Sequence, residues 1–349
     1  MPVISAVVVS YRSGALAVRA IETIRQDAKA SGHSLETIAV VNSLDAEEAR
    51  SLEGAADRVL VPGRNLGYAG GLNAGLAAAS GEVLVLSNPD VLVRPGALLA
   101  LLEAARSRFV AAGPAFFLDE GETLHMPPAE EPCPLCLARR SLAARGSAAV
   151  FRRALRRARR AAREAEAGET AEVSALSGAL VAVSRETLER VGRFDESYTL
   201  YYEENDWQRR LRARGGTLLR VGKAHVVHAY NRSARLEPLA AEWFAQSERR
   251  YFETHFGRRG VSALEALASE RSGAPTLAAL PDGVLRFEGS AFVALSPLPD
   301  FGSFVLHPRV ESGAWRPPGD VREGFGGATW FARAVDAATL EILAEGSLT

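Results

Sequence analysis

The chain has 349 residues and a formal net charge of −1, so it can bury a full core and has no general electrostatic attraction for nucleic acid. No apolar run reaches the roughly 20 residues of a membrane-spanning helix, and the N-terminus lacks the basic start of a signal peptide. Its two cysteines are too few for a disulfide framework and fit a reducing cytoplasm, where we expect the protein to reside.

Strand and helix patterns alternate through the first third of the chain. Short runs of β-branched and other apolar residues predict buried strands, and longer segments with apolar residues at helical spacing predict helices. The strands are expected at residues 3–9, 36–42, 58–61 and 82–86, and the helices at residues 16–30, 45–52, 68–79 and 95–106. This alternation implies right-handed crossovers and an α/β fold with a doubly wound sheet.

Polar residues follow each of these predicted strands. Ligands of doubly wound sheets bind beyond the carboxyl ends of the strands, where such residues meet. The polar exits are Ser10-Tyr11-Arg12, Asn42-Ser43, Arg64-Asn65 and Asn88-Pro89-Asp90. We therefore expect a ligand site at this edge of the sheet.

Asp90 is the carboxylate among these exits. An aspartate just past a buried strand is well placed to hold Mg²⁺ or Mn²⁺, because these hard ions bind one or two carboxylates together with phosphate oxygens and waters. The alternative is an ordinary turn, which Asn and Asp often form where a chain leaves a strand.

A glycine-rich segment, NLGYAGGLNAG at residues 65–75, leads into the predicted helix at 68–79. Glycine lets the backbone approach a ligand closely, and a helix N-terminus favours anions. The segment has neither the lysine of a P-loop nor the spacing of a dinucleotide fingerprint. A tightly packed helix is the alternative interpretation.

An acidic cluster, YYEENDW at residues 201–207, precedes a predicted helix at 206–213. Acids suit a first helical turn whatever their function. Together with Asp90, however, they allow one site to hold a metal while the other accepts a proton. His228 ends a predicted strand at 224–228 and could complete the metal site, although His225 shares its face and the pattern cannot separate the two.

The middle of the chain is rich in arginine. Residues 138–166 have a helical pattern, and ten arginines lie between Arg139 and Arg163. This helix could make a peripheral contact with anionic lipid headgroups on the inner face of the cell membrane. Alternatively, it is a solvated helix whose arginine stems cover apolar surface. Cys133 and Cys136 form a lone CxxC pair, too few ligands for structural zinc.

The remaining patterns define the domains. Further strands are expected at 217–221 and 224–228, with helices at 186–191 and 238–256, the latter closed by Gly257. After residue 265, strands at 284–295, 303–310 and 329–335 alternate with Gly, Pro and Asp turns. We expect a first domain at 1–262, with an Arg-rich helical insertion at 137–168, and a small β-rich domain at 265–349.

Several segments, in this order, resemble the family 2 glycosyltransferases, and especially the rhamnosyltransferase-like branch that builds bacterial surface polysaccharides. They are VVVSY (7–11), NLGYAGGLNAG (65–75), LSNPD (86–90), SGA (177–179), GRFDE (192–196), YEENDW (202–207) and VVH (226–228). Together they span roughly residues 3–260, and the ordered set is far more specific than any single segment.

The resemblance implies a GT-A fold, which is a Rossmann-like doubly wound mixed sheet, and a metal-dependent, inverting transfer. The donor would be a nucleotide-diphosphate sugar, such as dTDP-rhamnose or a UDP-sugar, and the acceptor a glycan or a lipid-linked hydroxyl. By the same resemblance, Asp90 and His228 face the metal and Glu204 is the general base.

The resemblance and the strand exits together suggest the substrate contacts. Expected donor contacts are Ser10, Tyr11, Arg12, Asn42, Asn65, Gly67, Asn73, Asn88 and Asp90; expected acceptor contacts are Ser177, Gly178, Glu203, Asp206 and Trp207. The indole of Trp207 could stack on a sugar ring or anchor its helix against Leu211.

Two departures from the family pattern leave alternatives open. Val41 stands where the family usually has an aspartate that contacts the nucleotide, and Glu204 is one methylene longer than the usual aspartate base. A catalytically weakened nucleotide-sugar-binding protein is therefore one alternative. A sugar nucleotidyltransferase is another, although residues 10–14 lack the usual basic, glycine-rich loop.

Overall fold

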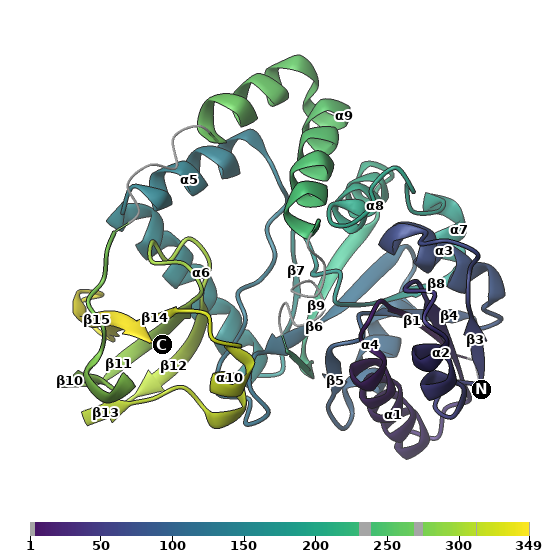
Figure 1. Ribbon diagram of the computed structural model, residues 1–349, viewed down its shortest axis with the longest axis horizontal. Coiled ribbons are helices and arrows are strands. Elements are labelled where there is room, and N and C mark those ends of the chain that lie inside the picture. The colour runs from purple at the N-terminus through teal and green to yellow at the C-terminus, as the bar shows by residue number, and fades with distance from the viewer. Residues whose placement is uncertain (1–3, 230–238, 269–274, 312, 349) are drawn as a thin grey trace. The chain divides into compact units, whose positions relative to one another are not determined.

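The computed structural model describes residues 4–229, 239–268, 275–311 and 313–348 (Figure 1). The chain forms two compact units. Unit 1 comprises Met1–Ala115, Ala129–Glu131 and Glu164–Phe256, and unit 2 comprises Phe116–Pro128, Pro132–Arg163 and Gly257–Thr349. Neither unit is continuous in the sequence, and the expected domain boundary at residues 262–265 stays a prediction.

Unit 1 is built on a mixed β-sheet with the strand order β3-β2-β1-β4-β8-β6-β9-β5, in which β7 also pairs with β9. The first four strands in this order are parallel, and β8 runs antiparallel to β4. The strands are β1 (Ile4–Ser10), β2 (Leu35–Val41), β3 (Arg58–Leu60), β4 (Val83–Ser87), β5 (Val91–Val93), β6 (Val110–Phe117), β7 (Thr170–Glu172), β8 (Leu180–Ser184) and β9 (Thr217–His228). The expected α/β fold with a mixed sheet is confirmed.

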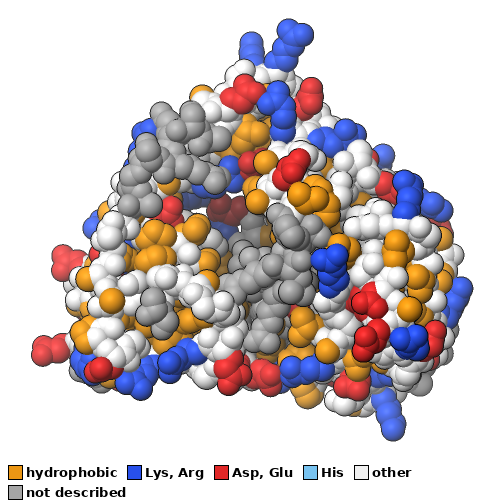
Figure 2. Space-filling model, in the orientation of Figure 1, with side chains coloured by type: hydrophobic (Ala, Val, Ile, Leu, Met, Phe, Trp, Pro, Cys, Tyr) orange, Lys and Arg blue, Asp and Glu red, His pale blue; other side chains and the backbone are white. Residues whose placement is uncertain are grey.

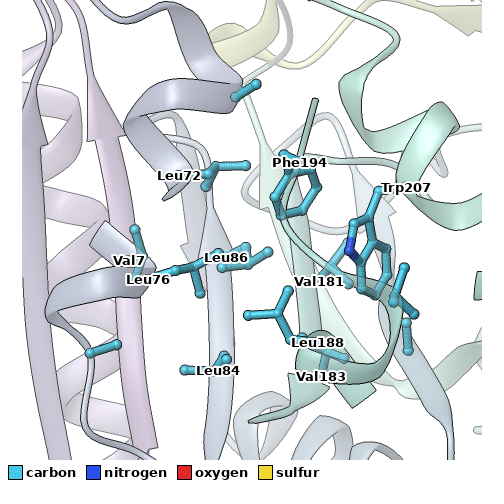
Figure 3. Packing of buried hydrophobic residues seen from close by; sticks show 14 of the residues in the cluster. Val7, Leu72, Leu76, Leu84, Leu86, Val181, Val183, Leu188, Phe194 and Trp207 are labelled. Atoms are coloured by element: carbon cyan, nitrogen blue, oxygen red, sulfur yellow. The ribbon is translucent and has the colours of Figure 1, made fainter. Parts of the chain in front are cut away.

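The helices of unit 1 pack against this sheet and against one another. They are α1 (Gly14–Ala30), α2 (Ala46–Glu53), α3 (Gly67–Ala78), α4 (Ala97–Ala105), α7 (Arg185–Val191), α8 (Glu203–Ala213) and the first part of α9 (Ala240–Ala268). Side chains alternate along each strand, so Val7 and Leu86 face α3 while Leu188 of α7 and Trp207 of α8 close the same core (Figure 3). This core holds α3, α7 and α8 in place, and the candidate site lies next to these helices.

Helix α3 lies unusually close to the sheet because glycines line its contact face. A Cβ atom at Gly75 would lie 2.3 Å from Cγ1 of Val7, and one at Gly71 would lie 2.8 Å from Cγ1 of Val9. These glycines allow the helix to pack closely on the sheet. For this part of the segment at 65–75, they support the alternative interpretation, a tightly packed helix.

Two expected boundaries are wrong. The strands expected at 217–221 and 224–228 are the single strand β9, which stays extended because β7 pairs with its first half and β5 with its last residues. The helical pattern at 138–166 is two helices, α5 (Pro134–Ala144) and α6 (Ala148–Glu166), separated at Gly146, whose φ of 75° is left-handed. The expected start at Pro238 lies outside the described residues, and Gly257 interrupts α9 with φ of 61°.

Unit 2 contains an antiparallel four-stranded sheet, ordered β12-β11-β14-β15, and a β10–β13 pair. Its further elements are η2 (Pro281–Gly283), β10 (Leu285–Phe287), β11 (Ala291–Ser296), β12 (Val305–Val310), β13 (Gly313–Trp315), α10 (Gly319–Gly324), β14 (Trp330–Asp336) and β15 (Ile342–Leu348). The expected β-rich part is confirmed.

Helix α6 completes the core of unit 2. Its apolar side chains Phe151 and Leu155 belong to one buried cluster with Phe292 and Leu306 of the sheet. The guanidinium of Arg159 lies 4.0 Å from the ring centroid of Phe292, so part of the arginine content of this helix covers apolar surface.

The close approach of α3 gives a stability prediction. We expect Gly75→Ala to lower the free energy of unfolding by about 1–3 kcal/mol, because the added methyl group must displace Val7 in a packed core. Urea unfolding followed by circular dichroism measures the change.

Gly54→Ala is the matched control. Gly54 has φ of −80° and its added Cβ would meet no atom within 4 Å, so this variant should unfold like the wild type. Equal midpoints for the two variants would contradict the packing argument.

Candidate active site

Asp90 lies at a junction of three segments. Its side chain is only 4% exposed, and its backbone carbonyl accepts a hydrogen bond from the backbone N–H of Ala229 (3.0 Å). The preceding Asn88 donates its backbone N–H to the carbonyl oxygen of Ala179 (2.8 Å). The loop after β4 is therefore fastened both to the end of β9 and to the SGA segment at 177–179.

His228 is the histidine that meets Asp90. Its Nε2 lies 3.3 Å from Oδ1 of Asp90, whereas the backbone carbonyl of His225 accepts a bond from Arg94 (3.1 Å). This separates two histidines that the sequence pattern left equivalent.

The pair of Asp90 and His228 fits a divalent cation. Within the described ranges there is no group of three or more His, Cys, Asp or Glu side chains that could hold a metal. One carboxylate and one imidazole suffice when phosphate oxygens and waters supply the remaining ligands, as Mg²⁺ and Mn²⁺ at nucleotide sites require.

The CxxC pair, which has too few ligands for structural zinc, has a local structural role. Cys133 caps α5, and its Sγ accepts a hydrogen bond from the backbone N–H of Cys136 (3.2 Å).

Glu203 and Glu204 open helix α8, which begins three residues earlier than the sequence predicts. The two residues before them, Tyr201 and Tyr202, both have left-handed backbone conformations, with φ of 69° and 70°. Such conformations cost energy for residues other than glycine and cluster at functional sites. The phenol of Tyr202 donates to Oε1 of Glu248 (2.7 Å), which helps to hold this turn.

The pKa values of both glutamates are raised. Burial, followed by the negative charge of Glu204, raises the pKa of Glu203 well above its ordinary value. Burial also raises the pKa of Glu204, but hydrogen bonds from its own backbone and from Glu203 lower it. Burial of two adjacent carboxyls therefore opposes the ionisation of both at once, and does so more strongly at Glu203.

The SGA segment brings Glu204 toward Asp90. A Cβ atom at Gly178 would lie 2.9 Å from Cγ of Glu204, so the glutamate side chain rests directly on this glycine. The neighbouring Ala179 bonds to Asn88, as described above. In addition, the charges of Glu203, Glu204 and Asp90 all raise the pKa of the Tyr68 phenol, behind the larger effect of burial. The two acidic segments therefore lie around one tyrosine.

The loop after β1 depends on Glu48, which the sequence analysis missed. This buried carboxylate of α2 accepts from the backbone N–H groups of Arg12 (3.0 Å) and Ser13 (2.9 Å) and from the hydroxyls of Ser10 and Ser43. The only sequence signal was a glutamate three residues after the helix cap Asp45, and that pattern usually indicates a local capping interaction.

Three asparagines expected at the donor instead hold loops. The Asn42 side chain donates to the carbonyl oxygen of Gly67 (2.6 Å), and the Asn65 side chain accepts from the Gly67 N–H (2.9 Å). Asn73 exchanges two hydrogen bonds with the backbone of Phe194 (2.9 and 3.1 Å). Asn42 and Asn73 are buried, so any effect they have on a donor passes through these loops.

The expected acceptor roles of Asp206 and Trp207 do not fit their contacts. Asp206 is paired with Arg210 (2.8 Å) and His255 (2.9 Å). Trp207 is 2% exposed, stacks on Phe194 and donates its indole N–H to the carbonyl oxygen of Gly192 (2.9 Å). Its indole has no free face for a sugar, and the alternative role as a helix anchor is correct (Figure 3).

Comparison with known proteins gives consistent matches. The family described as "Glycosyltransferase like family 2" matches residues 2–253. The N-acetylglucosaminyl-diphospho-decaprenol L-rhamnosyltransferases of Mycobacterium tuberculosis strains CDC 1551 / Oshkosh and ATCC 25618 / H37Rv are each 32% identical to the chain over 195 residues. The match covers 52% of this chain and 61% of each relative's length.

Solved structures resemble the chain more distantly. The crystal structure of GalNAc-T7 with UDP, GalNAc and Mn²⁺ has 13% identity and a TM-score of 0.49, covering 97% of this chain and 68% of that one. The mannosyltransferase PcManGT from Pyrobaculum calidifontis, in complex with GDP-Man and Mn²⁺, has 16% identity and a TM-score of 0.45, covering 78% and 76%.

The protonation of the two glutamates gives a pH-dependent prediction. A buried carboxyl whose pKa is raised in the folded state binds more protons there than in the unfolded state. Its contribution to the free energy of unfolding is therefore present below the ordinary pKa of 4.5 and is lost as the pH rises above that value. We expect Glu203→Gln to unfold with a free energy roughly 0.5–2 kcal/mol higher than the wild type at pH 7. The advantage should disappear by about pH 4, where both carboxyls are protonated in either state.

Glu253→Gln, at an exposed position of α9, makes the same side-chain substitution as a control. Denaturant unfolding of both variants from pH 4 to 8 tests the assignment, which is wrong if the difference between Glu203→Gln and wild type does not vary with pH.

Proposed function

This chain belongs to glycosyltransferase family 2, with unit 1 as its GT-A domain, and from that premise we propose that it is an inverting glycosyltransferase. It moves a sugar from a nucleotide-diphosphate donor to an acceptor hydroxyl. The observation that carries this proposal is the contact of Glu204 with Gly178, whose neighbour Ala179 is hydrogen-bonded to the loop that bears Asp90, so that a base and a metal ligand lie in one region.

Glu204 is the proposed general base. It accepts the proton of the acceptor hydroxyl while the oxygen attacks the sugar C1 from the face opposite the leaving diphosphate, so that one C–O bond forms as the other breaks. Glu203 supports this role because its pKa is raised further than that of Glu204, which favours Glu204 as the carboxylate that accepts a proton. Gly178 keeps the glutamate side chain in place from below.

Asp90 and His228 are the proposed ligands of Mg²⁺ or Mn²⁺. When bound, such an ion would supply positive charge where negative charge develops on the leaving diphosphate. Backbone hydrogen bonds of Asn88 with Ala179 and of Asp90 with Ala229 hold the loop that bears this carboxylate.

The curated relatives suggest the substrates. Their name describes transfer of L-rhamnose to a lipid-linked N-acetylglucosaminyl diphosphate. We therefore propose rhamnose, carried by dTDP, as the first donor to test and a lipid-linked glycan as the acceptor. A UDP-sugar is the second donor to test, because Val41 replaces the aspartate that would read the nucleotide.

Helix α6 is the proposed contact with a lipid surface. Arg152, Arg156, Arg160 and Arg163 form an exposed stripe on a face turned away from the buried side chains. Acidic and basic side chains are interspersed over the face drawn in Figure 2, so a stripe of one sign is distinctive. Among the described segments, no helix is both long enough and apolar enough to cross a bilayer.

The base assignment gives a direct test. We expect Glu204→Gln to reduce transfer about 10²–10⁴-fold, because the amide cannot accept the proton, while nucleotide-sugar binding stays within about twofold of wild type. Nucleoside-diphosphate release from dTDP-rhamnose and Mn²⁺ measures turnover, and calorimetry measures binding.

Glu253→Gln controls for loss of a carboxylate elsewhere in unit 1 and should keep full turnover. Near-normal turnover of Glu204→Gln would falsify the base assignment. Binding without release by the wild type, across dTDP-, UDP- and GDP-sugars, would instead indicate a catalytically weakened binding protein.

The arginine stripe gives a separate prediction. Changing Arg152, Arg156 and Arg163 together to Gln should weaken sedimentation with phosphatidylglycerol vesicles by about 10²-fold at low salt, since each basic residue near an anionic surface contributes about 1 kcal/mol. A triple change of the exposed Arg50, Arg106 and Arg108 in unit 1 removes equal charge and should leave binding intact. Equal loss in both variants would mean that net charge alone is responsible.

A further inference from the structure

The proposed mechanism does not use Tyr68, although the charges of Glu203, Glu204 and Asp90 act on its phenol. This tyrosine occupies the first turn of α3, and its backbone N–H donates to the carbonyl oxygen of Thr199 (2.9 Å). The preceding Gly67 has φ of 69°, and a Cβ there would lie 2.6 Å from the same oxygen. The start of α3 is thus held directly against the segment that leads to Glu203 and Glu204.

The phenol oxygen of Tyr68 is buried and has no hydrogen-bond partner among the described residues. Oε2 of Glu203 and Oε2 of Glu204 are also buried and have no hydrogen-bond partner among the described residues. Buried polar atoms are nearly always hydrogen-bonded in folded proteins, and an unsatisfied group calls for a partner. Three such atoms gathered in one site indicate that the partner is a polar ligand.

The charge around the phenol determines what it can do. Burial and the nearby carboxylates Glu203, Glu204 and Asp90 keep the pKa of Tyr68 well above its ordinary value, so the hydroxyl remains a hydrogen-bond donor. A donor near both the base carboxylate and the metal-binding carboxylate lies near the part of the substrate between the acceptor oxygen and the diphosphate. That part is the sugar being transferred.

We infer that the hydroxyl of Tyr68 donates a hydrogen bond to an oxygen of the transferred sugar and thereby sets its orientation between Glu204 and Asp90. This inference rests on the proposed glycosyltransferase function. It makes Tyr68 a determinant of sugar binding rather than of nucleotide binding. It also explains why a tyrosine hydroxyl is buried in the protein without a partner.

Tyr68→Phe tests the inference, because the change removes only the hydroxyl. We expect affinity for dTDP with Mn²⁺ to stay within about twofold of wild type, and affinity for dTDP-rhamnose to fall about tenfold, as for one lost hydrogen bond to a ligand. Transfer should fall at least as much. The thermal midpoint should not decrease, because the free protein loses no hydrogen bond.

Tyr198→Phe is the matched control, since Tyr198 is a fully buried tyrosine of the same unit. It should leave the ratio of dTDP-rhamnose to dTDP affinity unchanged. Equal ratios for Tyr68→Phe and wild type would overturn the inference, and so would a marked loss of stability, which would give the hydroxyl a structural role.

The proposed function and the role of Tyr68 are contradicted by different results. If the wild type binds and turns over no sugar nucleotide in a panel of dTDP-rhamnose, UDP-glucose and GDP-mannose, the proposed function is wrong and the inference falls with it. If the wild type transfers sugar while Tyr68→Phe matches it in every measurement, only the role of Tyr68 is wrong. Where another donor of the panel is preferred, its nucleotide diphosphate replaces dTDP in the comparison.

Discussion

The antiparallel pairing of β4 with β8 is the constraint on which the site depends. It sets Ser87 opposite Leu180, so the loop that leaves β4 and the segment that enters β8 meet at one edge of the sheet. The first carries Asp90 and the second carries Gly178, on which Glu204 rests. A parallel strand at this place in the sheet would send its entering segment to the opposite end of the strands, and the two carboxylates would be separated by the length of a strand.

Several buried residues support the site by holding its loops in place. Glu48 collects four hydrogen bonds from the loops after β1 and β2, and Asn73 ties α3 to the loop at Phe194. Against this support, the site keeps energetically unfavourable features: two left-handed tyrosines and a pair of buried, adjacent carboxyls. Such features persist only where the surrounding structure over-determines them.

Sequence patterns predict the strands and helices of unit 1 well where the elements are long and apolar, and poorly elsewhere. The three-residue strand β5 is too short to show a period, and Gly113 and Pro114 make part of β6 look like a turn. At the site, the resemblance, and not the sequence pattern, singled out His228, whose Nε2 lies 3.3 Å from Asp90. The expected sugar contact of Trp207 fails because residue type does not reveal whether a side chain points to a ligand or into the protein, whereas the expected donor contact of Asn42 stays a prediction.

The two faces of helix α6 have different roles. Arg159 and the apolar residues of its inner face build the core of unit 2, whereas Arg152, Arg156, Arg160 and Arg163 of the stripe are exposed. Substitutions along the stripe can therefore accumulate without loss of folding. Among descendants of one ancestral chain, the electrostatic character of this surface is free to drift or adapt while the catalytic unit remains under separate selection.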